Sequence, residues 1–343
     1  MTTRGLTLAA LLAALGRPSW WLLALAGFLV RGGVLLFLLA IVSLPSPLII
    51  SNIVAPVIVP LALGRIDPGA IALLGGGAAI VAIWLVGGAL VAATTEVALI
   101  RTARDAMLKE GLPVGPVAPP RRRLIGRGAA SHLLAHVPTA LVLAVGSVRI
   151  AGVAYIELTD PFDVTTPLIF RIAAGAAGSI AAIVVVWLLG ELVGGLAARR
   201  IVLRGASVGG GLRGAFGDLV RRPAAALAPA LWTTLVLVID LAAGLGIVAL
   251  AWTQLGERLT DSTTDLATTT FWILAFPASW IGALALTGLV DAWRSAAMTF
   301  EVERAGVAAA SGADRAPDPG GTFGAPPGRR PGDWSTTDGG GSL

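Results

Sequence analysis

The chain has 343 residues, of which 56% are hydrophobic and 13% are charged, and its net charge is +5. Soluble domains carry about 25% charged residues, so this composition excludes an ordinary soluble globule and favours a chain embedded in lipid. Cysteine is absent, which excludes a disulfide scaffold, and the basic residues are scattered between apolar runs, which argues against nucleic-acid binding. Lys109 is the single lysine; the abundant arginine and glycine are typical of a GC-rich bacterial genome.

Residues 1–18 contain the apolar stretch from Leu6 to Leu15, which resembles the core of a signal peptide. No small-residue cleavage site follows it, and Arg17 and Pro18 interrupt the apolar pattern. We therefore predict a short interfacial helix at the N-terminus.

A membrane-spanning helix needs about 20 apolar residues. Six runs of this kind lie at 19–43, 70–95, 130–154, 167–192, 226–251 and 270–293, within a transmembrane domain of residues 19–300. The apolar stretch 44–64 contains four prolines, and lipid cannot satisfy the backbone groups that proline leaves unpaired. It is predicted to be an interfacial or re-entrant outer segment. The polar stretch 309–343 is predicted to be a disordered cytoplasmic tail.

The basic residues outside the six runs are distributed very unevenly. Twenty lie in segments on one side of the membrane and two, Arg65 and Arg258, on the other. Because cytoplasmic segments are enriched in Lys and Arg, this asymmetry predicts a multi-pass protein of the cell (inner) membrane with both termini in the cytoplasm.

Two internal repeats organise the chain. The sequence Trp84–Gly87 matches Trp187–Gly190, and each is followed 17 residues later by an arginine. A basic segment, a proline and then an apolar run occur three times, at Pro18, Pro138 and Pro223. The pattern predicts an all-α polytopic bundle of three helical hairpins, each preceded by a cytoplasmic interfacial helix. Chance similarity between alanine-rich helices is the alternative.

The segment from Gly211 to Arg222 has Leu212, Phe216 and Leu219 on one helical face. Anionic headgroups would attract such a basic amphipathic helix, so its residues are candidates for contact with lipid or a partner. These candidate contact residues are Arg213, Phe216, Arg221 and Arg222. The glycine-rich stretch 207–212 just before it lacks the ending of a phosphate-binding loop and is interpreted as a flexible linker.

Two charges fall inside the apolar runs. Arg31 lies in the first run and Asp240 in the fifth, and both are expected near 18–21 Å depth at about 1.5 Å per residue. They are a candidate intramembrane pair, either as a structural ion pair, which we favour, or as the polar centre of a transport or relay site.

Other charges lie closer to the membrane surfaces. Arg149 and Arg171, in the outer thirds of the third and fourth runs, are expected either to anchor these helices or to line an outer-side cavity for an anion. Glu96, Glu191 and Asp291 are interpreted as inner interface residues.

No catalytic or cofactor motif emerges. His132 and His136 have the i, i+4 spacing of zinc ligands, but no glutamate separates them and no third ligand is evident. We therefore predict no catalytic, cofactor or metal site, and no enzyme activity.

Two resemblances follow from these patterns. The stretch Gly205-Ala206-Ser207…Phe216…Arg222-Pro223 resembles the coupling loop of ABC-transporter permeases, although the loop's glutamate is missing and Arg222 replaces its leucine. The repeated basic helix, proline and span over about 1–300 resembles uncharacterised six-span bacterial membrane families, including the membrane domain attached to some glycerophosphodiesterases. The second resemblance implies an accessory module without a catalytic site of its own.

The sequence thus predicts a non-enzymatic membrane protein that acts as an accessory or scaffolding module of an envelope or transport complex. Its expected contacts are membrane lipids and a membrane-protein partner. The alternative is a transporter or permease subunit with Arg31 and Asp240 at its polar centre.

Overall fold

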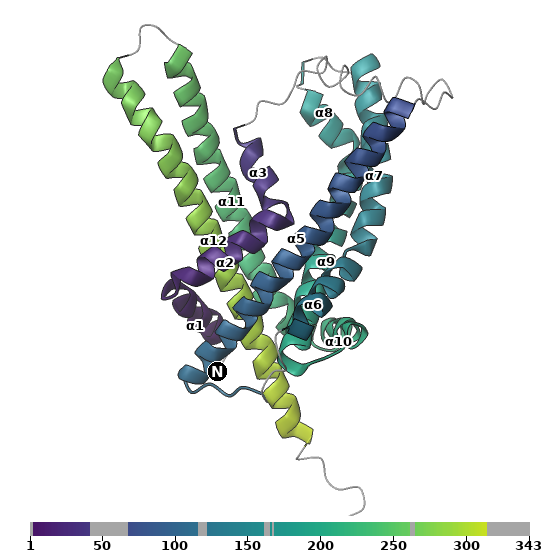
Figure 1. Cartoon of the computed structure of the whole chain (residues 1–343), viewed down its shortest axis with the longest axis vertical. Helices are drawn as coiled ribbons and strands as arrows, with labels where there is room; N and C mark the ends of the chain where they lie inside the picture. Colours follow the sequence, from purple (N-terminus) through teal and green to yellow (C-terminus); the bar gives the residue numbers. More distant parts are fainter. Residues whose placement is uncertain are drawn as a thin grey trace, which may run out of the picture.

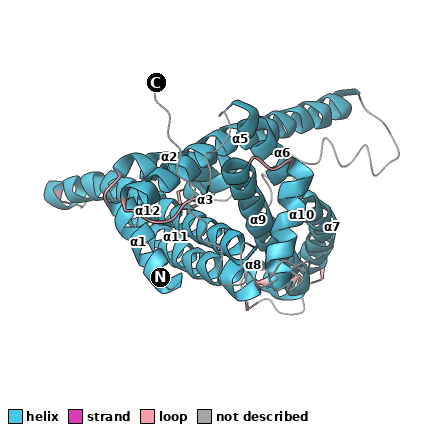
Figure 2. Cartoon of the chain, turned by 90° about the horizontal axis from the view of Figure 1, so that it is seen from below, coloured by secondary structure: helices cyan, strands magenta, loops and turns pink. Residues whose placement is uncertain are grey.

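The computed structural model describes residues 3–41, 68–115, 122–160, 165–166, 168–260 and 265–313. In this part of the chain the regular elements are all helices, which confirms the all-α fold class (Figures 1 and 2). The elements are α1 (Thr3–Leu15), α2 (Pro18–Phe28), the π-helical turn η1 (Leu29–Gly33), α3 (Val34–Leu39), α5 (Pro68–Lys109), α6 (Arg122–Ala135), α7 (Val137–Thr159), α8 (Leu168–Gly175), α9 (Ala177–Arg204), α10 (Val208–Arg221), α11 (Pro223–Thr260) and α12 (Leu266–Ala313).

Six helical stretches of the described chain are long and apolar enough to cross a membrane. They are Pro18–Leu39, Ile71–Lys109, Leu124–Thr159, Ala177–Arg204, Ala226–Thr260 and Leu266–Ala308. Helix α5 shows the lipid-facing character best, because its residues 71–87 are exposed although nearly all are apolar. A helix of this kind is stable only where lipid or another protein covers it. The chain is therefore a multi-pass membrane protein.

The spans form three hairpins, as the repeat predicts. The first joins α2–η1–α3 to α5, the second joins α7 to α8 and α9, and the third joins α11 to α12. The short helices α1, α6 and α10 precede the three hairpins and lie toward one end of the bundle (Figure 1). A proline begins the span after each of them, because its missing N–H would have no partner in a first helical turn.

The three short helices pack in a cyclic order. Helix α6 lies against α5 and α9, α10 lies against α9, and α1 lies against α12. Each therefore contacts the second helix of the hairpin before its own, and α1 closes the ring on the last hairpin (Figure 2). The second helices α5, α9 and α12 also contact one another.

Two of the three apolar clusters found in the described chain lie in the half of the bundle that holds the short helices, and the third packs Phe37 against Val248 and Ala283. One cluster brings Ala10 and Trp20 together with Met107 and Phe300, and a second packs Ile100 against Leu124, Ile201 and Val202. The outer halves of the spans diverge above this core (Figure 1).

A close helix contact fixes the first hairpin to the third. Gly288 of α12 lies against α2, and a Cβ at this position would stand 2.7 Å from the carbonyl oxygen of Trp21. Only glycine allows the two backbones to approach so closely.

Several local predictions need correction. The third predicted run, 130–154, is divided at His136 between α6 and α7, and the fourth, 167–192, is divided at Ala176 between α8 and α9. The glycine-rich stretch 207–212 is the first turn of α10, not a flexible linker: the Gly210 N–H donates to the Ser207 hydroxyl at 3.1 Å, an N-cap that replaces the missing helical partner. The left-handed Gly205, with φ of 67°, ends α9 just before it.

Helix α12 begins with a similar cap. The Thr268 N–H donates to Asp265 at 3.0 Å, and hydrogen bonds from Thr268 hold the pKa of the Asp265 carboxyl below its ordinary value. At its other end α12 continues to Ala313, so residues 309–313 of the predicted tail are helical. The rest of that tail and the predicted re-entrant segment 44–64 lie outside the described residues.

Candidate functional site

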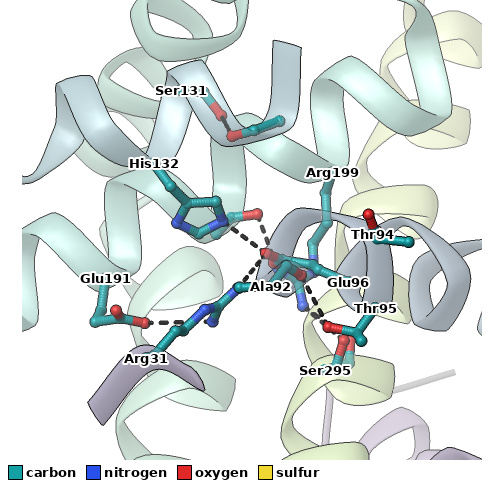
Figure 3. Close-up of polar contacts among 12 residues, drawn as sticks. Arg31, Ala92, Thr94, Thr95, Glu96, Ser131, His132, Glu191, Arg199 and Ser295 are labelled. Carbon is teal, nitrogen blue, oxygen red and sulfur yellow. Dashed lines mark hydrogen bonds and ion pairs between the residues drawn. The ribbon is translucent and has the colours of Figure 1, made fainter. Parts of the chain in front are cut away.

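Glu96 of α5 is the centre of a group of charged side chains that all three hairpins supply (Figure 3). Arg31 Nη2 donates to its Oε2 at 2.7 Å, and His132 Nε2 lies 2.6 Å from the same oxygen. Arg199 Nη1 donates to Oε1 at 3.4 Å. The Glu96 carboxylate therefore joins η1, α6 and α9 to α5.

Glu191 of α9 is the second carboxylate of the group. His136 Nε2 lies 3.3 Å from its Oε1, while Arg31 Nη1 and Arg294 Nη2 lie 3.9 and 3.7 Å from its Oε2. Arg294 Nη1 also donates to Asp291 one turn earlier in α12, at 3.4 Å. The two networks meet at Arg31, which contacts both glutamates.

We name this group the central charge cluster. Its members are Arg31, Glu96, His132, His136, Glu191, Arg199, Asp291 and Arg294. Glu191 and Asp291 lie at the inner ends of the apolar runs of their helices, so the cluster lies at the edge of the apolar zone that is nearest to the short helices.

An irregular turn in the first span positions Arg31. Residues 29–33 form a π-helical turn that is kinked at Gly32, whose φ of 111° lies outside the helical range and is rarely adopted by a residue with a Cβ. The kink changes the direction of the first span next to Arg31. Here the turn carries the arginine that contacts both glutamates.

Arg199 is held from several sides. Its Nη1 donates to the Gly195 carbonyl at 2.7 Å, and its Nη2 donates to the carbonyl and hydroxyl oxygens of Ser295 at 3.1 and 3.2 Å. Only 2% of the residue is exposed. These contacts fix the guanidinium between α9 and α12, where it can offset the Glu96 charge.

The cluster contains as many arginines as carboxylates. Three arginines face three carboxylates around a cavity of about 40 Å³, which has room for one or two water molecules but not for an organic solute. The buried Nε atoms of Arg199 and Arg294 have no hydrogen-bond partner among the described residues. The arrangement can therefore bind charge or water, and it ties the hairpins together electrostatically.

The two histidines contact different carboxylates. His132 pairs with Glu96, whereas His136 uses Nε2 for Glu191 and Nδ1 for the His132 carbonyl at 2.9 Å. One ring nitrogen of each histidine thus contacts a carboxylate of the central charge cluster. The zinc-like spacing of the sequence reflects two successive contacts with carboxylates, one from α6 and one from the junction of α6 and α7.

The predicted pair of Arg31 and Asp240 is wrong. Asp240 accepts a hydrogen bond from the Thr287 hydroxyl at 3.0 Å, which joins α11 to α12, and no ion pair connects it to Arg31 in the described chain. Depth along a helix gives the height of a side chain but not the direction in which it points. Arg31 faces α5 and α9 instead.

The other sequence candidates lie apart from the cluster. Arg171 pairs with Glu157 at 3.4 Å, while Arg149 lines a groove of about 390 Å³ between α7 and α9 to which Arg171 does not contribute. The structure therefore does not unite the two arginines in one outer cavity. On α10, Leu212 and Leu219 pack on the core, whereas the four candidate contact residues are exposed. These are Arg213, Phe216, Arg221 and Arg222.

Sequence reasoning missed the role of Glu96, Glu191 and Asp291, which it placed at the membrane interface. A usable signal was present, since one such carboxylate lies at or just beyond the inner end of the apolar run in the second helix of every hairpin.

Comparison of the chain with protein-family models, with curated proteins and with solved structures finds no match. The resemblances noted in the sequence therefore stay predictions. The fold and the cluster by themselves define the class, a multi-pass helical membrane protein whose three hairpins share one network of ion pairs.

Proposed function

We propose that this chain is a non-enzymatic integral membrane protein that serves as an accessory or scaffolding module of a membrane complex. One observation carries the proposal: the charges of the central cluster are paired with one another across all three hairpins, around a cavity of only about 40 Å³. Such a cluster is suited to holding helices in fixed positions, and it leaves no room for a solute to bind or react.

The surface available to a partner lies on the outer halves of the spans. In α5, Ile80 and Ile83 are 70% and 72% exposed, and the chain around them touches little of the bundle. An apolar helix exposed on every side is covered by lipid tails or by helices of another membrane protein. The inner halves, in contrast, are already packed against each other.

The arginine asymmetry supports the orientation within this proposal. The segments that hold α1, α6 and α10 carry most of the basic residues, which favours placement of this end and both termini in the cytoplasm of a bacterial cell. The membrane is then the inner one.

The experiment is site-specific photocrosslinking in native membranes, followed by gentle extraction and mass spectrometry. A photoreactive residue at Ile80 should yield a defined protein adduct, whereas one at Val220, which is 80% exposed on α10, serves as the matched control for random collision. Lipid adducts alone at Ile80, or the same set of proteins at both sites, would contradict the scaffold proposal.

A second candidate is a transporter or permease subunit whose polar centre is the charge cluster. The unpartnered Nε atoms of Arg199 and Arg294 favour it, because buried donors beside a cavity are suited to binding an ion. In proteoliposomes a transporter should show ion or solute flux that Glu96→Gln abolishes while the protein stays folded. A scaffold should show no flux, and an ATPase among its crosslinked partners would favour the permease.

A further inference from the structure

A second charged cavity lies between α9, α10, α11 and α12, away from the central charge cluster. It has a volume of about 170 Å³ and is situated where the short helix α10 turns into the span α11. Its polar lining consists of Arg200, Arg204, Arg221, Arg222, Asp218 and Glu301. Four arginines thus surround a hollow that contains only two carboxylates.

Each of the two carboxylates already forms an ion pair with an arginine. Asp218 receives two hydrogen bonds from Arg200, at 2.9 and 2.6 Å, and Glu301 pairs with Arg304 on its own helix. Each acid therefore has an ion-pair partner, and the lining of the cavity contains two more arginines than carboxylates.

The other three arginines form no ion pair within the described chain. The Arg204 guanidinium donates one long hydrogen bond, of 3.4 Å, to the Val302 carbonyl. The guanidinium groups of Arg221 and Arg222 make no hydrogen bond or ion pair with the described residues, and both residues are exposed. Guanidinium groups in excess over carboxylates around one cavity form a site for an anion, and guanidinium geometry suits phosphate oxygens in particular.

The rest of the cavity is apolar. Ala226 and Pro229 of α11 and Met298 of α12 form this wall. On the adjacent α10, Phe216 and Val220 are 58% and 80% exposed beside the arginines. A basic helix with exposed apolar side chains at the end of a membrane span lies in the headgroup region of the bilayer. The ligand that fits such a place has a phosphate and an apolar portion.

We propose that this cavity binds the headgroup of an anionic phospholipid. Arg204, Arg221 and Arg222 donate to the phosphate oxygens, while Ala226, Pro229 and Met298 contact the apolar part of the lipid next to the headgroup. This site goes beyond the scaffold proposal and does not depend on it, since either a scaffold or a transporter can hold a lipid here.

The test is native mass spectrometry of the full-length detergent-solubilised protein with added phosphatidylglycerol or, for comparison, phosphatidylcholine. The unaltered protein should retain phosphatidylglycerol preferentially. In the double variant Arg221→Gln/Arg222→Gln the affinity for phosphatidylglycerol should fall by about tenfold or more, because two charge-assisted hydrogen bonds to the phosphate are lost. Arg127→Gln is the control, since it removes an exposed charge from the short helix α6 outside the cavity and should change the affinity less than about twofold.

A variant that keeps every charge completes the test. Ala226→Phe fills the apolar side of the cavity and should also abolish retention of the lipid, with the apparent melting temperature serving as a check of folding. Equal losses in Arg127→Gln and in the double variant would mean diffuse attraction and overturn the site. Displacement of the lipid by millimolar glycerol phosphate or inorganic phosphate would show that a free phosphate suffices, which would overturn recognition of a lipid.

Discussion

Arg31 and Glu96 are 65 residues apart in the chain, yet the guanidinium Nη2 of the first span lies 2.7 Å from the carboxylate Oε2 of the second. The same carboxylate contacts His132 and Arg199, so one side chain joins four helical elements. Because 10% of the Glu96 side chain is exposed, the charges around it depend on each other more than on solvent.

Removal of the Glu96 charge should therefore destabilise the whole bundle. Glu96→Gln keeps the shape of the side chain but leaves Arg31 and Arg199 without their main counterion, which should lower the free energy of unfolding by about 3–5 kcal/mol. Denaturant titration of the detergent-solubilised protein measures the loss. Glu257→Gln at the exposed end of α11 is the control and should change stability by less than about 1 kcal/mol. Equal stability of the two variants would show that the cluster does not hold the hairpins together.

Exchange of the two charges tests the partners directly. Arg31→Glu and Glu96→Arg should each accumulate poorly, and the double variant should recover part of the folded yield, with a coupling energy of about 1–3 kcal/mol. Asp240→Asn should stay close to the unaltered protein, since an amide oxygen can still accept from the Thr287 hydroxyl. Rescue of Arg31→Asp by Asp240→Arg, rather than by a change at Glu96, would contradict the observed pairing.

The contact of α12 with α2 should tolerate no side chain at Gly288. In Gly288→Ala the added methyl group would stand 2.7 Å from a backbone oxygen, and separation of the helices should cost about 1–3 kcal/mol. Gly282→Ala on the same helix is the matched control, because nothing lies within 4 Å of its added Cβ and alanine favours a helix. Apparent melting temperatures of the two variants should move in opposite directions; a fall of equal size in both would argue against a specific helix contact.

The π-helical turn should depend on glycine as well. Gly32→Ala places a Cβ on a residue with φ of 111°, which should cost about 1–3 kcal/mol and disturb the position of Arg31. Gly246→Ala, in the regular part of α11 with open space around it, should be neutral or stabilising. If the first variant also leaves stability unchanged, the turn is not required for the fold.

Accessibility of engineered cysteines tests the orientation, and the natural chain provides a background without cysteine. A cysteine at Thr260, exposed at the end of α11, should react with an impermeant thiol reagent added to intact cells. One at Glu110, exposed at the opposite end after α5, should react only after the membrane is opened. The reverse pattern would place both termini outside.

Most of the architecture could be predicted from the sequence, because a segment that crosses lipid must be a helix of a minimum length and mostly apolar. Span length and the three prolines report directly on which segments cross the membrane, and the six spans, the hairpins and the short helices are confirmed. The proline pattern also marked Pro223, where α11 begins, although the fifth run was predicted to start at residue 226.

The partners of the buried charges could not be read in the same way. Hydropathy gives the depth of Arg31, but its direction depends on the π-helical turn and on the left-handed Gly32, which no sequence period reveals. Likewise, Glu96 and Glu191 follow apolar runs and have the pattern of ordinary interface residues. Only the packing of α5 against α9 shows that they face inward.

The contact of α1 with α12 has a consequence for biosynthesis. Ala10 and Ala14 are fully buried, and the Trp293 indole N–H donates to the Thr7 carbonyl at 2.9 Å across 286 residues of chain. Helix α1 therefore finds its main partner in α12, which the ribosome synthesises much later. Until α12 has been translated, α1 exposes an apolar face and the cyclic packing of the short helices stays incomplete. A chain truncated before α12 is therefore expected to be a substrate for membrane quality control.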